Sequence, residues 1–442
     1  MSRTPLGRLG LIALASAAML AGSPAREQGI QPLDLERVRG MLRDAYDNVK
    51  RNYYDPKFHG LDWEARYHEY DEKIRSVNSL GQGLGTVAEF LEALHDSHTY
   101  FRPPSRPVRI DYGYRMELVG DKGFVTHVRP GTDAETKVHP GDQVVAVNRV
   151  EVNRQSFDTM NYYFEVLAPQ PGLRLALRDP AGQIRDISVN SRMQQMKKVV
   201  DLTGSDGGTD IWQMIREEEN FDHAVRQRYA EMGDAMIWKM PEFFLEDHEV
   251  DHLFDIARKH KTLILDLREN GGGLVDTLSR MVGNIFDHEV KVADRITRKP
   301  DKPQVAKSRG NNIFTGNIIV LIDSASASAS ELFARVVQLE NRGTVLGDRS
   351  SGSVMESRGF PCSQGVDFKI FYSFSITHAD LIMKDGKSLE HNGVVPDETI
   401  LPTAQDIANG RDPVLSRAME IAGVKIDPAA AGKMFPYEWL PF

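Results

Sequence analysis

Four serines alternate with alanine at residues 324–330, between the apolar run IIVLID and the amphipathic stretch ELFARVV. The run predicts a strand and the stretch predicts a helix, so the serines connect the two. Ser328 and Glu331 have the spacing of a helix capping box, which favours a structural role for Ser328. A serine at a helix N-terminus also lies where the dipole and free N–H groups stabilise an oxyanion, so Ser328 is also a candidate nucleophile.

A second candidate element is the turn from Asn270 to Gly273, which follows the apolar run TLILDL. Glycines at such a turn allow a backbone N–H to point toward a ligand oxygen. A permissive turn between a strand and a helix is the alternative interpretation. A phosphate-binding loop is excluded, because no Lys-Ser/Thr pair follows the glycines.

Two further motifs carry groups suited to proton transfer. LHDSHTYF brings Ser97 and His98 to the end of a helical region, and SLEHNGVVPDE places Glu390 on a polar turn. Histidine titrates near neutral pH and supplies the base that hydrolysis needs. A structural histidine and an exposed loop carboxylate are the alternatives. His95, Asp96 and His98 cluster without HExxH-like spacing, so we expect no metal site.

Composition limits the class of protein. The chain has 442 residues, is 41% hydrophobic and 26% charged, and carries a net charge of -9. These values indicate a folded protein of two or three domains, and the negative charge argues against a nucleic-acid partner. Cys362 is the only cysteine, so no intramolecular disulfide is possible.

The first 25 residues resemble a secretory signal peptide, with Arg3 and Arg8 before LGLIALASAAMLAG and SPA at the cleavage site. The apolar run is shorter than the roughly 20 residues that span a bilayer. We therefore expect an exported protein, periplasmic or secreted, that does not span the membrane after cleavage.

The rest of the chain changes character twice. Amphipathic stretches between residues 34 and 97 predict helices, and RPPSRP at 102–107 ends them. Short β-prone runs then predict a compact β-rich module, and alternating apolar runs and amphipathic stretches predict an α/β region with a buried, largely parallel sheet. The expected segments are a signal peptide (1–25), an N-terminal helical region (26–106), a β-rich domain (107–198), an α/β core (199–425) and an aromatic C-terminal tail (426–442).

Taken in order, the motifs resemble those of the tail-specific, or carboxy-terminal processing, serine peptidases (family S41) and their tricorn-like relatives. The resemblance covers nearly the whole mature chain and rests on YYDPKFHGLDW, LHDSHTYF, a PDZ-like segment, LILDLRENGGG, SASASELFA, TVLGDRSSGS and LEHNGVVPD. It implies an α/β fold: a crotonase/ClpP-like protease core with an N-terminal helical region and an inserted PDZ-like domain. It also implies that Ser328, three residues before Glu331, is the nucleophile. The implied oxyanion donors are the N–H groups of Ala329 and Gly272, with Gly271 as the next choice.

The sequence departs from one branch of that family at the catalytic base. The branch carries a lysine in a T-x-G-K-like motif, and here the matching stretch GDRSSGSV has Ser353 at that position. The tricorn-like branch implies another arrangement, in which His98 takes the Ser328 proton and Ser97 bridges His98 to Glu390. This arrangement requires the N-terminal helices to dock on the α/β core.

The β-rich segment resembles a PDZ domain, which binds an extended C-terminus at a sheet edge and holds its carboxylate with backbone N–H groups. The implied carboxylate loop is Gly113, Tyr114, Arg115 and Met116. The tail KMFPYEWLPF is expected to pack on the body, and occupation of the chain's own PDZ groove is the alternative.

The resemblance implies an exported serine endopeptidase that cleaves unfolded or C-terminally marked proteins through an acyl-enzyme, with the PDZ-like domain selecting or gating the substrate. The implied partners are protein or peptide substrates, and no metal or organic cofactor is implied. One alternative is a catalytically inactive peptide- or ligand-binding relative of the same fold. Another alternative is an esterase or thioesterase that uses the same nucleophile on small acyl substrates.

Overall fold

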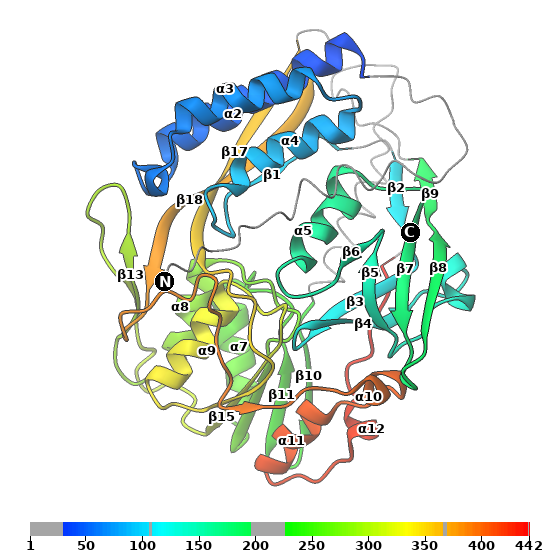
Figure 1. Cartoon of the computed structure of the whole chain (residues 1–442). Coiled ribbons are helices and arrows are strands. Elements are labelled where there is room, and N and C mark those ends of the chain that lie inside the picture. The colour runs from blue at the N-terminus through cyan, green and yellow to red at the C-terminus, as the bar shows by residue number, and fades with distance from the viewer. Residues whose placement is uncertain (1–29, 106–107, 196–225, 366–368, 441) are drawn as a thin grey trace, which may run out of the picture.

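The computed structural model describes residues 30–105, 108–195, 226–365, 369–440 and 442. The predicted signal peptide lies outside these residues. Figure 1 shows the N-terminal helices at the top, the α/β core below them and the β-rich module to the right. Within the described ranges, we find no helix with the length and apolar character needed to cross a membrane.

The α/β core contains a six-stranded sheet in the order β10–β11–β12–β15–β16–β19. The strands from β11 to β19 are parallel, as the sequence predicts. At one edge β10 is antiparallel, because a turn at Gly233 and Asp234 folds it back on β11. The bounds are β10 Arg228–Met232, β11 Ala235–Lys239, β12 Thr262–Asp266, β15 Asn317–Ile322, β16 Thr344–Gly347 and β19 Glu398–Thr399.

Helices cover both faces of this sheet, which explains why its central strands are apolar over most of their length. One face packs against α7 (Asp247–Ala257), α8 (Val275–Gly283) and α9 (Ala329–Leu339). The other face packs against α11 (Pro413–Ile421) and α12 (Pro428–Ala431). Because β12 and β15 are parallel neighbours, the glycine turn and the serine run follow them at the same edge of the sheet.

The N-terminal helices dock on the core through a long β-hairpin. They are α2 (Pro32–Asn52), α3 (Trp63–Arg75) and α4 (Leu80–Glu92), and η1 (Phe58–Gly60) lies between the first two. They share a hydrophobic cluster with the hairpin strands β17 (Met355–Gln364) and β18 (Ile370–Ile382). β18 also pairs with β1 (Tyr100–Arg102) and with β13 (Val290–Ile296), which pairs with β14 (Gln304–Ala306). The β1 pairing fixes the end of the LHDSHTYF motif to the body.

The β-rich module is a separate antiparallel sheet in the order β3–β4–β5–β7–β8, with β6 on β5. Its strands are β3 Tyr114–Val119, β4 Lys122–Val128, β5 Gln143–Val147, β6 Val150–Glu151, β7 Gly172–Arg178 and β8 Ile184–Asn190. The turn η2 (Asp133–Thr136) and a helix, α5 (Phe157–Asn161) continuing into η3 (Tyr162–Leu167), pack with it. A two-stranded ribbon of β2 (Val108–Asp111) and β9 (Arg192–Gln195) closes the module. β3 is an edge strand of its sheet.

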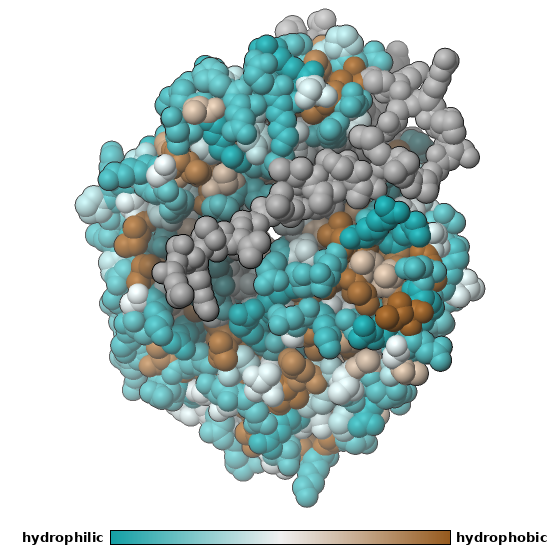
Figure 2. All heavy atoms as spheres, viewed as in Figure 1, coloured by the Kyte–Doolittle hydropathy of each residue, from teal (hydrophilic) through white to brown (hydrophobic). Residues whose placement is uncertain are grey.

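After β19, α10 (Ala404–Ala408) leads to α11 and α12, and the chain then returns to the β-rich module. The C-terminus lies beside this module in Figure 1. Figure 2 shows mostly hydrophilic residues on this face of the molecule, with hydrophobic residues in small separate groups.

Candidate active site

The structure distinguishes the four serines of the 324–330 run. The hydroxyls of three of them donate to backbone carbonyls: Ser324 to Leu118 at 2.7 Å, Ser326 to Leu267 at 2.8 Å and Ser330 to Asn270 at 2.9 Å. These three serines hold the connection in place. The hydroxyl of Ser328 donates to no acceptor within the described parts of the chain.

Ser328 has a strained backbone. It is the N-cap of α9 with φ 57° and ψ -116°, outside the conformations that L-residues prefer. Its N–H donates to Ser353 O at 2.8 Å and to Glu331 Oε2 at 3.0 Å. The predicted capping relation between Ser328 and Glu331 is present, and it holds the serine in this conformation.

Glu331 is buried and binds several groups of the loop around Ser328. Its carboxylate also accepts from the Ser350 hydroxyl at 2.6 Å and from the N–H groups of Gly352 and Ser353 at 2.8 and 3.0 Å. Burial raises the pKa of Glu331 to about 7, and these donors act in the opposite direction. Sequence reasoning gave Glu331 only a capping role, since residues 350–353 come into contact with it only in the folded chain.

Ser97, His98 and Glu390 form one hydrogen-bonded unit, although Glu390 is far away in the sequence. The Ser97 hydroxyl donates to Glu390 Oε2 at 2.9 Å and lies 2.8 Å from His98 Nδ1. The Ser97 N–H donates to Glu390 Oε1 at 2.7 Å. Because a hydroxyl has one proton, and here it goes to Glu390, Ser97 Oγ accepts from an Nδ1–H of His98. The Nε2 atom of His98 is then unprotonated and able to act as a base.

A polar anchor fixes the histidine loop to β18. Asp96 Oδ1 accepts from the N–H groups of His98 and Thr99 at 3.0 and 2.6 Å and from the Thr377 hydroxyl at 2.7 Å. Burial lowers the pKa of His98, and the nearby charge of Asp96 opposes this effect. His98 is therefore neutral at pH 7, the state that a general base requires.

The segment 352–354 connects this unit with Ser328. Val354 N–H donates to Glu390 Oε2 at 2.8 Å, and the neighbouring Ser353 carbonyl accepts from Ser328 N–H. His391 N–H also donates to Gly352 O at 2.7 Å. The structure thus brings both predicted halves of the site onto the same short loop.

Ser353 stands where one branch of the family has lysine. Its Oγ lies 3.0 Å from Ser351 Oγ, and its main chain binds Ser328 and Glu331. The three lysines nearest in sequence are exposed: Lys369, Lys384 and Lys387. Ser353 therefore acts here through its backbone, and none of these lysines is available as a buried base.

The glycine turn lies against the serine. A Cβ added at Gly272, where φ is +99°, would meet Ser328 Cβ at 2.7 Å and Ala329 N at 3.0 Å. The N–H of Ala329 has no hydrogen-bond acceptor among the described residues, in accord with its predicted place in an oxyanion hole.

The N–H of Gly272 differs from the prediction, because it donates to Asn270 Oδ1 at 2.8 Å. The N–H of Gly271, the second choice, has no acceptor in the ranges that the structure describes. Asn270 closes the turn over two residues, as asparagine side chains commonly do. Its amide also donates to Met240 O at 2.8 Å, and its Oδ1 accepts from the Ser330 hydroxyl at 2.7 Å. The role of Asn270 escaped the sequence analysis, although an Asn before Gly residues is a known turn signal.

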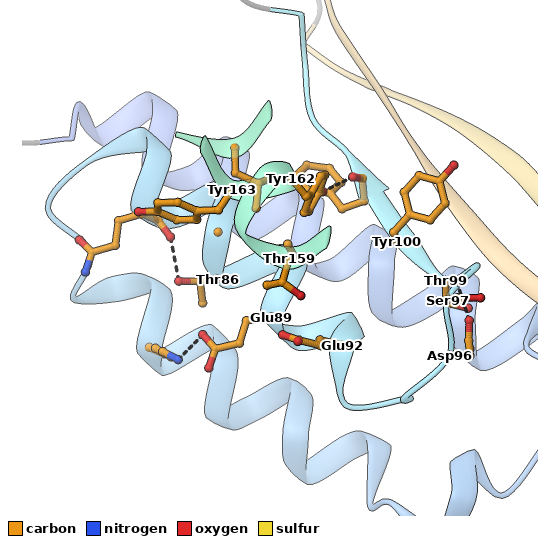
Figure 3. Close-up of a pocket in the computed structure, with 16 residues that line it drawn as sticks. Thr86, Glu89, Glu92, Asp96, Ser97, Thr99, Tyr100, Thr159, Tyr162 and Tyr163 are labelled. Atoms are coloured by element: carbon orange, nitrogen blue, oxygen red, sulfur yellow. Dashed lines mark hydrogen bonds and ion pairs between the residues drawn. The ribbon is translucent and has the colours of Figure 1, made fainter. Parts of the chain in front are cut away.

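A cavity of about 420 Å³ opens beside Ser97, between the N-terminal helices and the β-rich module. In Figure 3, Thr86, Glu89 and Glu92 of α4 face Thr159, Tyr162 and Tyr163 of α5–η3, with Asp96, Ser97 and Tyr100 at one end. The cavity has aromatic walls and a carboxylate-bearing side, and Ser97 is the member of the Ser97–His98–Glu390 unit that lines it.

The predicted carboxylate loop lies at the start of β3. Gly113 has φ 77°, and its N–H donates to Asp111 Oδ1 at 2.8 Å, so this donor is occupied. The other loop residues line a second cavity of about 320 Å³ between β3 and α5–η3: Tyr114, Arg115 and Met116 on the strand, and Met160 and Phe164 on the helix. A strand edge beside a helix is the geometry in which PDZ domains bind peptides.

Comparison with known proteins identifies the class. Residues 236–400 match the family model for peptidase family S41, and residues 35–80 match that for the tricorn protease C1 domain. The first range contains Ser328, the glycine turn and Glu390, while the second lies in α2 and α3. The chain therefore contains a peptidase S41 domain and a tricorn C1 domain, and these matches support a serine-type peptidase.

Relatives with curated names agree with this class. The chain is 21% identical over 408 residues to the chloroplastic carboxyl-terminal-processing peptidase 1 of Arabidopsis thaliana, covering 88% of this chain and 76% of that one. It is 23% identical over 325 residues to the tail-specific protease of Haemophilus influenzae, covering 68% and 43%. It is 29% identical over 301 residues to a probable CtpA-like serine protease of Staphylococcus aureus, covering 66% and 52%. The chain thus spans about half or less of these two bacterial relatives.

Two solved structures share the fold. Mature CPAF superposes with a TM-score of 0.62 at 14% identity, covering 85% of this chain and 94% of CPAF. The photosystem II D1 C-terminal processing protease superposes with a TM-score of 0.50 at 18% identity, covering 90% and 99%. At these identities the likeness concerns the fold.

Proposed function

We propose that this peptidase is an exported serine endopeptidase that cleaves unfolded or C-terminally marked proteins, with Ser328 as its nucleophile. Export rests on the signal-like residues 1–25. Protein substrates are in keeping with the names of two relatives, a carboxyl-terminal-processing peptidase and a tail-specific protease.

In the first step, His98 Nε2 takes the proton of Ser328 Oγ as Oγ bonds to the scissile carbonyl carbon. The developing oxyanion accepts hydrogen bonds from Ala329 N–H and from a glycine N–H of the 270–273 turn. The imidazolium then donates its proton to the leaving amine, which departs with the C-terminal product. A water molecule, deprotonated by His98, attacks the acyl-enzyme and restores the Ser328 hydroxyl.

The Ser97–Glu390 pair stabilises the charge that forms on His98. As the imidazolium forms, Nδ1–H donates to Ser97 Oγ, which donates in turn to the buried carboxylate of Glu390. Glu390 also has two backbone donors, Ser97 N–H and Val354 N–H, that fix its position. This hydrogen-bonded unit is the single observation that carries the proposal, since a protein without catalytic activity would not require Ser97, His98 and Glu390 to be joined in this way.

The β-rich module is proposed to act as a PDZ-like gate for substrates. The edge strand β3 and the cavity between β3 and α5–η3 support this role, because an extended peptide can add to such an edge. The other wall of the α5–η3 helix faces the cavity beside Ser97 (Figure 3). A peptide bound beside β3 would therefore contact the α5–η3 helix, whose other side borders the cavity at Ser97.

The test uses residues 26–442 and a disordered protein as substrate. Wild type is expected to cleave it, Ser328→Ala and His98→Ala to lose activity, and Ser353→Ala to remain active. Cleavage of small esters but not of the protein would favour an esterase. A wild type that cleaves nothing yet binds C-terminal peptides would refute the peptidase proposal in favour of an inactive binding relative.

A further inference from the structure

The last residues of the chain lie along the β-rich module. We call residues 436–442, PYEWLPF, the terminal segment. It follows Met434 and Phe435, which pack against the hydrophobic cluster beside α11. Its first residues are held near β10 by a hydrogen bond from Arg228 to Pro436 O at 2.9 Å and by an ion pair of Arg226 with Glu438 at 2.6 Å. Beyond these contacts its aromatic side chains extend over the module.

Each aromatic ring of the terminal segment lies under a guanidinium group. Arg115 is 5.0 Å from the ring centre of Tyr437, and Arg129 is 4.3 Å from that of Trp439. Arg192 is 4.1 Å from the ring centre of Phe442. We call Arg115, Arg129 and Arg192 the arginine row. Cation–π contacts of this kind contribute about 0.5–1 kcal/mol each at exposed sites and more when shielded from water.

Two further contacts hold the terminal segment on the module. The Tyr437 ring stacks on His127 at 4.2 Å, and His127 lies opposite Arg115 in the β3–β4 pairing. Arg129 Nη1 donates to the main-chain carbonyl of Leu440 at 2.9 Å. The module thus recognises side chains and backbone of the segment together.

The terminal segment also borders the peptide groove. Tyr437 and Trp439 line the same cavity of about 320 Å³ as Arg115 of β3 and Met160 and Phe164 of α5–η3. The edge strand β3 and the aromatic residues of the segment therefore face one space. A second peptide entering the groove would meet both rings.

Arg115 links this site to the glycine turn. Its guanidinium donates to Glu269 Oε2 at 2.9 Å, and Glu269 is the residue before Asn270. Glu269 has φ 65°, and its N–H donates to both Asp323 carboxylate oxygens at 3.0 and 3.1 Å. The conformation of this residue is therefore set by its partners, one of which is the arginine that Tyr437 covers. In this arrangement Gly272 N–H is bound to Asn270 Oδ1.

We propose that the groove and the arginine row form one binding site for aromatic-rich peptide segments, that the chain's own terminal segment occupies the arginine row and forms one wall of the groove, and that its departure admits a substrate segment of the same kind. The second part deepens the proposed function, because it names the class of substrate segment and a form of self-inhibition. The contacts select a segment with aromatic side chains at alternate positions, as in Tyr437 and Trp439. Bound Tyr437 covers the guanidinium group of Arg115, which donates to Glu117 Oε1 at 2.6 Å and to Glu269 Oε2 at 2.9 Å, so the segment contacts a residue bound to the start of the glycine turn.

Binding is tested by fluorescence anisotropy with the labelled peptide PYEWLPF. The proteins are residues 26–442 and the same chain ended after Phe435, which keeps the residues that pack beside α11. A tethered segment competes at an effective concentration of about 1 mM, so the shortened chain is expected to bind the peptide at least about tenfold more tightly. A peptide with alanine in place of tryptophan should bind the shortened chain at least about tenfold more weakly than PYEWLPF. Equal affinities for the two proteins, or no binding to the shortened chain, would overturn the proposal.

A full-length double variant, Tyr437→Ala with Trp439→Ala, tests the same site without shortening the chain, in case the shortened chain misfolds. It is expected to gain peptide affinity in the same direction, whereas Phe371→Ala, which removes an exposed aromatic ring of β18, is expected to match wild type. A double variant that binds the peptide no better than Phe371→Ala would count against the site.

Proteolysis separates this inference from the proposed function. The shortened chain should cleave a disordered protein several-fold faster than the full chain, and added PYEWLPF should slow it again. If no protein has proteolytic activity while the affinities change as expected, the peptidase proposal fails and the binding site stands. If wild type is active and neither affinity nor rate responds to removal of the segment, the function stands and this inference fails.

Discussion

Ser97 is the most informative position, because it is neither nucleophile nor base yet joins His98 to Glu390. Ser97→Ala removes one oxygen that accepts from His98 Nδ1–H and donates to Glu390 Oε2. The Ser97 backbone N–H still donates to Glu390 Oε1 at 2.7 Å, so the loop keeps its anchor. The substitution therefore isolates the bridge from the fold around it.

The magnitude follows from the charge that the bridge stabilises. Nδ1–H belongs to a neutral ring in the resting enzyme and to an imidazolium in the transition state, so most of the loss falls on the chemical step. A hydrogen bond to a charged partner contributes about 1.5–3 kcal/mol, and each 1.36 kcal/mol is tenfold in rate. We expect kcat to fall about 10- to 150-fold by these values, with KM nearly unchanged.

The assay is steady-state cleavage of a fluorogenic peptide selected from the cleavage products of a disordered protein. Ser97→Thr retains the hydroxyl and should recover most of kcat. Ser416→Ala is the matched control, because it removes one hydroxyl that donates to Ile426 O at 2.7 Å on the far side of the core. A Ser97→Ala enzyme with the kcat of wild type, or with a change in KM alone, would refute the bridge.

Three further outcomes are expected. Gly272→Ala should lower activity by about 5- to 150-fold, because its Cβ would meet Ser328 Cβ at 2.7 Å and overpacking costs about 1–3 kcal/mol. Gly359→Ala, whose Cβ meets nothing within 4 Å, should leave activity intact. The kcat/KM should fall as pH decreases from about 7, because protonation of Glu331, whose pKa is about 7, removes an acceptor of loop hydrogen bonds. It should fall further through the pKa of His98, which burial lowers from 6.5, because the protonated ring cannot act as the base. A kcat/KM that is constant down to pH 5 would contradict both assignments. Arg268→Ala should destabilise the fold by about 3–5 kcal/mol in denaturant unfolding, because Arg268 binds the buried Asp266 at 2.7 Å and Asp412 at 2.8 Å; an unchanged midpoint would show that these carboxylates need no partner.

The sequence predicts the parallel core sheet well, because strands buried on both faces are apolar throughout and leave a clear pattern. It also places Ser328 at the start of α9, since the Ser-x-x-Glu spacing is a local signal. The antiparallel edge strand β10 was missed, because its direction depends on a two-residue turn that also suits other connections. Local patterns decide such elements only where burial or capping makes one arrangement clearly preferable.

The candidate site was harder to predict because it is assembled from distant segments. No spacing rule connects Ser97 with Glu390, so their association was implied only by the family resemblance. The roles of Asn270 and Glu331 depend on partners that meet them only after folding. For the aromatic tail the sequence left two alternatives, packing on the body or occupation of the PDZ-like groove. The contact of Tyr437 with Arg115 forms only in the folded chain, so no local pattern predicts it.

The central claim is that Ser328 is the nucleophile and that His98 activates it. A fluorophosphonate probe bonds covalently to an activated serine, so labelling of residues 26–442 followed by mass spectrometry of the labelled peptide tests the claim directly. We expect one label per chain, on Ser328, and at least about 100-fold slower labelling in His98→Ala, since general base catalysis contributes about 100- to 10,000-fold. Labelling on Ser324, Ser326 or Ser330, or labelling of Ser328 at the same rate without His98, would contradict it.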